Sequence, residues 1–261
     1  MLFVVDIGNT NIVVAIMKSA SNVVCEGRIA TVKTDTADIL TEGFEAFLKE
    51  HEDIRKEISG VAISSVVPEI TDAAAQAAQA VTGYEPLVLS YRTDTGITIA
   101  NDNPQTTGMD LIAAAAGAAA EYSGALAIYD LGTATTMTVV TADRRFLGGL
   151  IMPGVGISKE AMVSRASQLP QFEIDAPEHF IGRNTIDSMR SGIVYGNAAM
   201  MDSLLERTKE DLNADVTGIV TGGLGRLIYP YCKSKFEYEP ELVLKGLWYI
   251  FERNHADGEM R

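Results

Sequence analysis

The sequence predicts an α/β protein made of two similar halves, each with a mixed β-sheet flanked by helices. Two observations predict it. Apolar runs of strand length alternate with segments of helical periodicity along the chain. A strand that ends in Asp-x-Gly opens each half, as LFVVDIG near the start and ALAIYDLG near the middle. A repeated order of this kind indicates an internal duplication.

In the first half, residues 1–122, three short strands rich in Val and Ile come first. A helix follows, because Ile39 and Phe44 recur at helical spacing after Asp35 and Thr36, either of which can cap it. The expected elements are strands at 2–7, 11–17 and 23–31, this helix, a strand GVAISSVV, a helix ITDAAAQAAQAV that stops at Gly83, a strand EPLVLS, and an Ala-rich helix from about Asp110 to Tyr122.

The second half, residues 123–261, repeats this order. Its expected elements are strands ALAIYD, TMTVVTA and RFLGGLI, a helix from near Ser158, a long helix over about 184–211, a strand VTGIVTGG and a closing helix PELVLKGLWYIFERN. In both halves a three-stranded meander precedes alternating helices and strands, which makes a mixed sheet with helices on its faces. No low-complexity linker separates the halves, so we expect a hinge-like boundary near Ser123–Gly124.

The composition is that of an ordinary globular protein, with 47% hydrophobic and 21% charged residues among 261. The formal net charge of −14 disfavours nucleic acid or an anionic membrane as a partner. Cys25 and Cys232 are too few for a disulfide framework. No signal peptide is visible, and the longest uncharged apolar stretch, LIAAAAGAAA, is far shorter than the roughly 20 residues that span a bilayer. These features predict a cytoplasmic protein.

Asp6 and Asp130 occupy the same position in the two halves, at the end of an apolar strand. Each is followed by a glycine, which lets the backbone approach a ligand, and then by hydroxyl or amide residues. The N–H groups of such a turn can surround an anion, and the carboxylate can hold a cation or its waters against phosphate oxygens. One such turn alone is better explained as a hairpin. Two such turns at matching positions of the two halves predict a site in which both turns bind one triphosphate from opposite sides.

The chain has no GxxxxGK[ST] motif and no GxGxxG after a strand, which excludes a P-loop and disfavours a Rossmann dinucleotide site. A third glycine turn, Thr221-Gly222-Gly223-Leu224-Gly225, follows an expected strand and opens a helix. Bare backbone at this turn could lie against an adenosine. Taken alone, the turn is explained equally well as an ordinary loop between a strand and a helix.

The three glycine turns resemble those of the actin-like ATPase superfamily, which includes acetate and sugar kinases, and imply two duplicated ribonuclease-H-like domains. Over essentially its whole length the chain is similar to the type III pantothenate kinases. The matching stretches are DIGNTN at 6–11, ISSVVP at 63–68, NPxxxGxD at 103–110, DLGTATT at 130–136, GGLIMPG at 148–154, LP at 169–170, IGRNT at 181–185, SGIVYG at 191–196 and TGGL at 221–224. This resemblance implies ATP-dependent phosphorylation of the primary hydroxyl of pantothenate, the first step of coenzyme A biosynthesis. It also implies Mg²⁺, a monovalent cation such as K⁺ or NH₄⁺, and a homodimer.

Residue by residue, the resemblance assigns several kinds of site. It implies that the ATP phosphates are bound by Asp6, Ile7, Gly8, Asn9, Thr10, Asn11, Ile12 and Val13, with Thr133 as a further nucleotide contact. It implies that Asp130 binds the monovalent cation and that Asp6 holds Mg²⁺ through phosphate or water. It implies a pantothenate pocket of Asn101, Gly108, Met109, Asp110, Leu111 and Thr185, with Asp110 as the general base.

The chemistry of Asp110 can also be argued from the residues. A carboxylate that accepts the proton of the attacking hydroxyl orients the nucleophile, and the Ala-rich helix after Asp110 permits a partly desolvated site. From the residues alone, a helix-capping role for Asp110 is better supported than a general-base role. The resemblance to the family reverses this preference. Thr185 could likewise mark only a helix start, and Arg183 could be a surface ion-pair partner. The three histidines lack metal-ligand spacing and are assigned no role.

Two positions depart from the family pattern. The family usually has Arg where this chain has Leu111, and tends to have Tyr where it has Asn101. An arginine can donate two hydrogen bonds to the carboxylate of pantothenate, and leucine donates none. Three hypotheses follow: a pantothenate kinase whose carboxylate contact comes from Arg92, Arg183 or a partner subunit; a divergent paralog that phosphorylates another small alcohol; and a non-enzymatic ATP-binding regulator. Asp110 and Thr185 favour the first hypothesis, Asn101 and Leu111 favour the second, and the retained Asp110 disfavours the third.

Overall fold

The computed structural model describes residues 1–166 and 168–255, which form two compact units. The first unit consists of residues 1–121 together with the C-terminal residues from 242 onward, and the second consists of residues 122–241. Each unit has its own sheet and its own core. None of the helices in the described ranges combines the length and the apolar character that crossing a bilayer requires.

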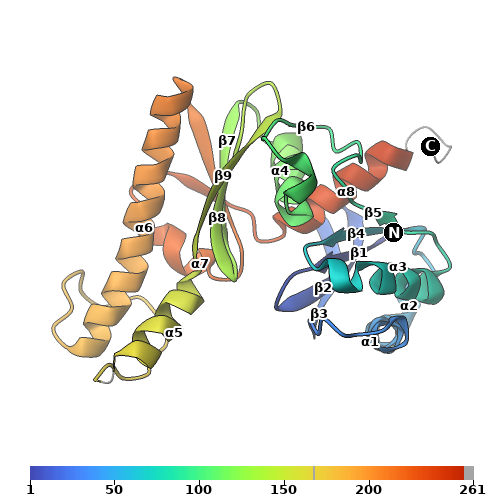
Figure 1. Cartoon of the computed structure of the whole chain (residues 1–261), viewed down its shortest axis with the longest axis horizontal. Coiled ribbons are helices and arrows are strands. Elements are labelled where there is room, and N and C mark those ends of the chain that lie inside the picture. Colours follow the sequence, from blue (N-terminus) through green and yellow to red (C-terminus); the bar gives the residue numbers. More distant parts are fainter. Residues whose placement is uncertain (167, 256–261) are drawn as a thin grey trace. The chain divides into compact units, whose positions relative to one another are not determined.

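The first unit contains a five-stranded sheet in the order β3-β2-β1-β4-β5 (Figure 1). Its strands are β1 (Leu2–Ile7), β2 (Asn11–Ser19), β3 (Asn22–Ala30), β4 (Gly60–Ser65) and β5 (Leu87–Val88). Its other elements are α1 (Ala37–Glu50), α2 (Glu52–Arg55), α3 (Pro68–Thr82), a short strand β6 (Thr98–Ile99), a 3-10 helix η1 (Pro104–Thr106), α4 (Met109–Glu121) and α8 (Leu242–His255). β1 is antiparallel to β2 and parallel to β4, so the sheet is mixed as predicted.

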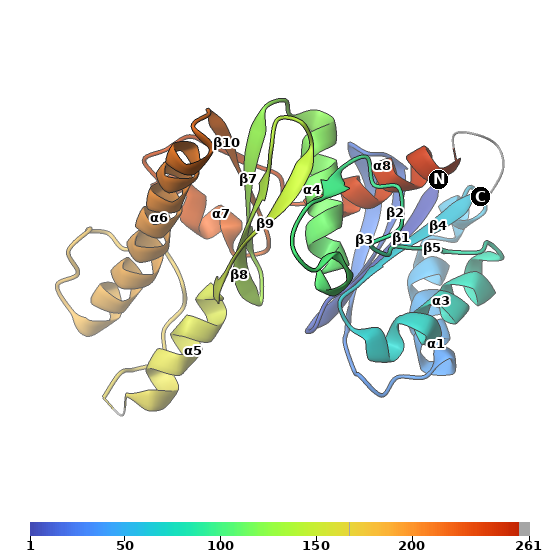
Figure 2. The ribbon, with the colours of Figure 1, turned by 45° about the horizontal axis from the view of Figure 1, so that its top comes forward.

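The core of the first unit follows from the alternation of side chains along its strands. Phe3, Val5 and Ile7 of β1 pack with α1 and α3, where Phe44 and Ile70 belong to the same buried cluster. The spacing that predicted the first helix therefore marks the residues that α1 buries. Figure 2 shows α1 and α3 together beside this sheet.

The last helix, α8, packs against α4 of the first unit. The two helices approach closely because both carry glycine at the contact. A Cβ added to Gly246 would lie 1.8 Å from the carbonyl oxygen of Ala113, and one added to Gly117 would lie 2.8 Å from the carbonyl oxygen of Leu242. By its place in the sequence α8 is expected in the C-terminal half, but in the structure it belongs to the first unit, where it packs against the small residues of α4.

The second unit contains a sheet in which five strands follow the order β11-β10-β7-β8-β9. Its elements are β7 (Ala125–Leu131), β8 (Ala134–Val140), β9 (Arg145–Pro153), α5 (Val155–Arg165), α6 (Thr185–Leu212), β10 (Val216–Thr221), α7 (Gly225–Ile228), η2 (Tyr229–Tyr231) and β11 (Phe236–Tyr238). Tyr129 and Leu131 of β7 share a buried cluster with Val194 and Met201 of α6. The long helix expected over about 184–211 is confirmed as α6.

The two sheets repeat one topology. The strand that ends in Asp-x-Gly is antiparallel to the strand after it and parallel to a later one, as β1 is to β2 and β4 and as β7 is to β8 and β10. Asp6 is paired with Ser64 of the parallel neighbour, and Asp130 is paired with Thr221. The predicted fold class, two duplicated α/β halves with mixed sheets flanked by helices, is confirmed.

Candidate active site

The turn after β1 contains the first candidate nucleotide residues. Inside the turn, the N–H of Gly8 donates to the carbonyl oxygen of Asn11 at 3.0 Å. Thr31, just after β3, holds the turn from outside. Its hydroxyl donates to the carbonyl oxygen of Gly8 at 2.7 Å, and its N–H donates to the carbonyl oxygen of Thr10 at 3.0 Å. Three hydrogen bonds thus fix the backbone of this turn before any ligand binds.

The eight residues 6–13 differ in what they can offer a ligand. The side chains of Ile7 and Ile12 are fully buried in the core, so these two residues can contribute only backbone groups. Asn9, Thr10 and Asn11 are exposed and can contribute side chains as well. Phosphate binding by this segment stays a prediction, in which Asn9, Thr10 and Asn11 can use side chains and Ile7 and Ile12 only backbone groups.

Asp110 lies at the same end of the first sheet as this turn. The N–H of Val66, directly after β4, donates to the carbonyl oxygen of Ile7 at 3.0 Å. A Cβ added to Gly108 would lie 3.4 Å from Cγ1 of Val66 and 2.5 Å from Oδ1 of Asp110. Ile7, Val66, Gly108 and Asp110 are therefore successive neighbours in space, although they come from three separate parts of the chain.

The surroundings of Asp110 favour a base over a helix cap. Its Oδ1 accepts a hydrogen bond from the N–H of Leu111 at 2.7 Å. Burial raises the pKa of the Asp110 carboxyl above its ordinary value, against the opposing effect of backbone N–H groups. A capping residue precedes its helix, whereas Asp110 is the second residue of α4. A desolvated carboxylate with a raised pKa is suited to accepting a proton.

Asn101, Met109 and Leu111 were also expected in the acceptor pocket, and they differ in polarity. Nδ2 of Asn101 donates to Oγ1 of Thr107 at 2.7 Å. Oδ1 of Asn101 is buried and has no hydrogen-bond partner in the described part of the chain. Met109 is buried and Leu111 is half-buried. Among these three side chains, only that of Asn101 presents an unused polar atom.

In the second unit, Asp130 lies between two glycines. A Cβ added to Gly222 would lie 2.3 Å from Oδ1 of Asp130, and one added to Gly132 would lie 3.2 Å from the same atom. Gly222 has a φ of +85°, which glycine adopts without steric cost. The N–H of Leu224 donates to the carbonyl oxygen of Leu131 at 3.3 Å and joins the two turns. The third glycine turn therefore packs directly on the carboxylate of Asp130.

Thr133 is exposed and lies beside the start of α5. A Cβ added to Gly154 would lie 1.9 Å from the carbonyl oxygen of Thr133, so only glycine permits this approach. Gly154 is the N-cap of α5, an 11-residue helix. The positive end of a helix dipole thus meets the turn after Asp130, an arrangement that favours anions. This contact between Gly154 and Thr133 is not predictable from the sequence, because the motif around Pro153 does not show which turn the start of α5 meets.

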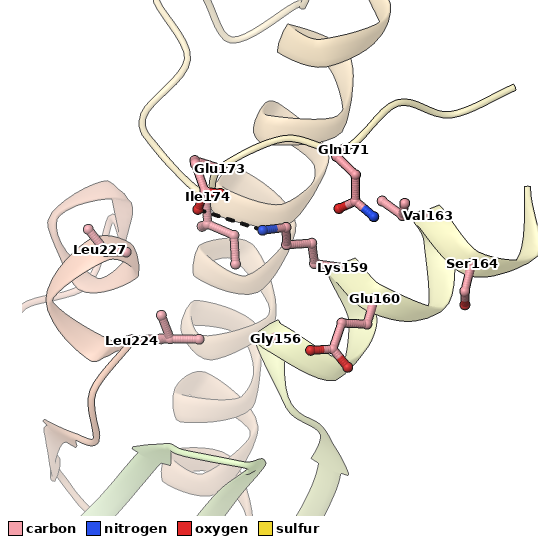
Figure 3. A pocket seen from close by; sticks show the side chains of 10 residues that line it. All are labelled: Gly156, Lys159, Glu160, Val163, Ser164, Gln171, Glu173, Ile174, Leu224 and Leu227. Atoms are coloured by element: carbon pink, nitrogen blue, oxygen red, sulfur yellow. Dashed lines mark ion pairs between the residues drawn. The ribbon is translucent and has the colours of Figure 1, made fainter.

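A cavity of about 720 Å³ opens beside the third glycine turn (Figure 3). Leu224 and Leu227 line one side of it, and α5 lines another. From α5, Lys159 extends toward Glu173, with Nζ 3.7 Å from Oε2 of Glu173 and 5.6 Å from the centre of the Phe172 ring. A cavity of this size is large enough for a nucleoside. Lys159 is not predicted as a site residue, because no local sequence pattern marks it and only the packing of α5 places it at a cavity.

Thr185 is the first residue of α6, and Asn184 caps this helix. Oδ1 of Asn184 accepts a hydrogen bond from the N–H of Asp187 at 2.9 Å. Both Thr185 and Arg183 line a second cavity, of about 790 Å³, with Met162 on its α5 side. Thr185 is thus both a helix start and a cavity residue. Within residues 1–166 and 168–255 no ion pair of Arg183 occurs, so the structure does not support the ion-pair role considered for it.

No group of three or more His, Cys, Asp or Glu side chains in the described ranges could hold a metal ion by itself. A cation would therefore need further oxygen ligands from nucleotide or water. The surroundings of Asp130 fit such an ion. Thr136, which is paired with Asp130 across β7 and β8, has a buried hydroxyl with no partner in the part of the chain that the structure describes. Carboxylate and hydroxyl oxygens are ligands that hard cations prefer.

The family model described as Type III pantothenate kinase matches residues 2–207 of this chain. A protein of Exiguobacterium sp. strain AT1b named type III pantothenate kinase is 39% identical over 255 residues, which cover 97% of this chain and 99% of that protein. A protein of the same name from Bacillus cytotoxicus is 36% identical over 265 residues, with coverage of 99% and 100%. A solved structure of a ROK family protein from Streptococcus pneumoniae shares the fold, with a TM-score of 0.54, 11% identity and coverage of 98% and 99%. The chain thus belongs to the type III pantothenate kinase family.

Proposed function

We propose that this protein transfers the γ-phosphoryl group of ATP to the primary hydroxyl of pantothenate and so forms 4′-phosphopantothenate, the first step of coenzyme A biosynthesis. One observation carries the proposal. Asp110 is a carboxylate with a raised pKa at the sheet end that also holds the turn after β1. The relatives named type III pantothenate kinase, which match nearly the whole chain, support the choice of acceptor.

In this proposal Asp110 accepts the proton of the acceptor hydroxyl as that hydroxyl attacks the γ-phosphorus. The attacking oxygen forms the new P–O bond, and the electron pair of the breaking bond leaves on the β-phosphate of ADP. Burial makes the Asp110 carboxylate a stronger base than a solvated aspartate, and the hydrogen bond from Leu111 holds its orientation. Gly108, Met109, Leu111 and Asn101 are proposed to line the acceptor side, and Thr185 is proposed as a further acceptor contact.

The proposed ATP contacts come from residues 6–13 and from Thr133. The turn after β1 is rigid before ligand binding, so little conformational entropy is lost when phosphate oxygens meet it. The start of α5 lies against the turn that contains Thr133 and contributes its helix dipole. We place the nucleoside in the cavity beside Leu224 and Lys159.

We propose that Asp6 holds Mg²⁺ through phosphate or water and that Asp130 holds a monovalent cation such as K⁺ or NH₄⁺. When bound, these ions neutralise charge that develops on the phosphate oxygens. Support for the second ion comes from the carboxylate of Asp130 together with the buried hydroxyl of Thr136, which is paired with it across β7 and β8.

The proposal is tested by ADP release with ATP, Mg²⁺ and K⁺ in the presence of pantothenate. Wild type should release ADP only with an acceptor present. Asp110→Asn should lower kcat by about 10²–10⁴-fold, the usual contribution of a general base. Asp72→Asn, on the exposed face of α3, should leave kcat unchanged. Near-normal turnover by Asp110→Asn would exclude Asp110 as the base.

A second candidate is the phosphorylation of another small alcohol, and Asn101 and Leu111 favour it. A panel of alcohols in the same assay distinguishes it from the first, because ADP release would then depend on an acceptor other than pantothenate. ATP binding without ADP release on any alcohol would instead support a non-enzymatic regulator.

We also propose a homodimer. Several apolar side chains of the second unit are exposed, among them Ile151 at 79% and Ile181 at 76%, and such surfaces favour association. Sedimentation equilibrium should give about twice the chain mass of 28.0 kDa. A monomer at micromolar concentration would contradict this part of the proposal. The cytoplasmic location that the sequence predicts stays a prediction.

A further inference from the structure

We infer that this enzyme recognises its acceptor through a neutral hydrogen bond to Asn101, and not through a cation at the start of α4. The acceptor class that follows is a primary alcohol with an amide N–H or a second hydroxyl as donor, whose far end can be uncharged. The inference rests on the proposed function, because it concerns the acceptor side of the same site.

The side-chain amide of Asn101 is held in one orientation. Its Nδ2 donates to Oγ1 of Thr107 at 2.7 Å, and the Thr107 hydroxyl in turn donates to the carbonyl oxygen of Asn103 at 3.3 Å. The other end of the amide, Oδ1, is buried and lacks a hydrogen-bond partner within the described ranges. A buried carbonyl oxygen of this kind is costly to leave unpaired, so it is expected to meet a donor when the site is filled. That donor must be an N–H or an O–H group.

Asn101 is close to the proposed base. Thr107, to which its amide donates, directly precedes Gly108. The carboxylate of Asp110 lies against Gly108, since a Cβ there would be 2.5 Å from Oδ1 of Asp110. One hydrogen bond and one peptide bond therefore connect Asn101 to the residue that Asp110 touches.

The side chains at the start of α4 offer no donor to a carboxylate. Leu111 has no donor in its side chain, and Met109 is buried. Burial raises the pKa of Asp110 against the opposing effect of backbone N–H groups, and no lysine or arginine side chain is among the causes of the shift. A carboxylate brought here would meet the charge of Asp110 with no side-chain cation to offset the repulsion, which is unfavourable at low dielectric.

Most cations in the described part of the first unit are engaged elsewhere. Ion pairs with Glu or Asp involve Arg28, Lys33, Arg55, Lys245 and Arg253. Arg92 donates to the hydroxyl of Tyr91 at 2.9 Å and lies over its ring. Lys18 follows Met17, which is paired with Leu2 at the opposite end of β1 from the turn. Under this inference, acceptor recognition in this unit therefore uses hydrogen bonds.

The first test compares pantothenate with its primary amide, in which a carboxamide replaces the carboxylate. ADP release by wild type with ATP, Mg²⁺ and K⁺ should give values of kcat/KM for the two acceptors that agree within about threefold. If any cation of the chain or of a partner subunit bound the carboxylate, the amide should lose roughly tenfold or more in kcat/KM. That loss would overturn the inference.

The second test is whether Oδ1 of Asn101 accepts a hydrogen bond from the acceptor. Asn101→Leu removes the accepting oxygen and should raise the KM for both acceptors roughly tenfold, with the KM for ATP unchanged. Gln105→Leu, at an exposed amide in η1, is the matched control and should alter neither KM. An unchanged acceptor KM in Asn101→Leu, or an equal rise in the KM for ATP, would contradict the hydrogen bond.

A third test uses two pantothenate analogues to identify which group of the acceptor donates to Asn101. With wild-type protein it does not depend on whether a variant folds. One analogue is methylated at the amide nitrogen, and the other has hydrogen in place of the secondary hydroxyl. Wild type should discriminate against one of them roughly tenfold. Asn101→Leu should no longer discriminate against that analogue, because the coupling between the two groups is lost. Equal use of both analogues and pantothenate by wild type would overturn the inference.

The outcomes separate the inference from the proposed function. Turnover of pantothenate with a poor primary amide keeps the proposed function and overturns the inference. Turnover of the amide alone overturns pantothenate as the acceptor and supports the neutral site. No ADP release with either acceptor overturns both.

Discussion

At the residue scale, Asp110 shows how a carboxylate becomes a stronger base without a partner charge. It lies against Gly108 and accepts one hydrogen bond, from Leu111. Burial makes the ionised form less stable than it is in water, which raises the pKa of Asp110. The same burial that serves proton transfer therefore lowers the stability of the folded protein whenever Asp110 is ionised.

Asp110→Asn is expected to stabilise the protein at pH 8 and to have little effect on stability near pH 3.5. The folded pKa of Asp110 is raised above its unfolded value, so the wild type loses stability as the pH rises from the unfolded pKa through the folded pKa. Asparagine stays neutral and avoids that loss. Thermal unfolding at the two pH values measures the difference. A stability gain that is equal at both would contradict the assigned direction of the pKa shift.

Gly222→Ala is expected to disturb the Asp130 site as well as the backbone. The new Cβ would lie 2.3 Å from Oδ1 of Asp130, and the φ of +85° adds strain of about 1 kcal/mol. We expect the dissociation constant for ATP, measured by calorimetry, to rise roughly tenfold.

The control for this substitution is Gly83→Ala at the end of α3. Gly83 has a similar φ of +80°, but a Cβ there meets nothing within 4 Å. The positive φ should lower the stability of both variants by a similar amount. Only Gly222→Ala should weaken ATP binding. Equal ATP affinity in the two variants would show that the contact with Asp130 has no part in nucleotide binding.

At the element scale, the turn after β1 depends on a strand that is distant in sequence. Thr31 lies just after β3 and donates its hydroxyl to the carbonyl oxygen of Gly8 at 2.7 Å. The mixed sheet makes this possible, because β2 pairs with both β1 and β3 and places the end of β3 beside the turn. The three-stranded meander β1-β2-β3 therefore holds in place the turn that is predicted to bind phosphate.

Thr31→Val should raise the KM for ATP about fivefold, since it removes one hydrogen bond worth about 1 kcal/mol from the turn. Thr41→Val is the matched control. Its hydroxyl also donates to a backbone carbonyl, that of Ala37 within α1, at 2.7 Å. Steady-state kinetics should show a changed KM for ATP in the first variant and not in the second. A KM that is normal in both would mean that the turn needs no support from β3.

At the scale of the whole molecule, the two compact units do not follow the division of the chain into halves. The chain leaves the first unit after Glu121 and returns to it at Leu242. The glycines of α4 and α8 make this return possible, because their backbones meet where a larger residue could not fit. The fold of the first unit thus depends on residues from both ends of the chain.

Gly246→Ala should lower the free energy of unfolding by about 3 kcal/mol or more, because the new Cβ would lie 1.8 Å from the carbonyl oxygen of Ala113 and would force α8 away from α4. Gly196→Ala is the control within α6, where a Cβ meets nothing within 4 Å. That variant should gain about 0.5–1 kcal/mol from helix propensity. Urea denaturation measures both. Similar stability of the two variants would contradict the close contact of α4 and α8.

The strands around both Asp-x-Gly turns, the helix α6 and the position of Asp110 at a helix start could be predicted from the sequence, because local periodicity and turn chemistry determine them. The expected strand EPLVLS is only Leu87–Val88 in the structure. An apolar run predicts a strand, but the number of its residues that pair with a neighbouring strand depends on the sheet. The contact of Gly222 with Asp130 could not be predicted, because it requires that β7 and β10 be parallel neighbours.

By itself, the sequence determined the duplicated α/β order, the family, and the residues that carry the proposed chemistry. Those features follow from patterns within short segments, and these patterns do not depend on distant parts of the chain. Only the tertiary structure decided that α8 joins the first unit, that Lys159 lies at a cavity and that Oδ1 of Asn101 is buried without a partner. Burial and close approach are properties of packed surfaces, and they exist only after segments far apart in the chain have come together.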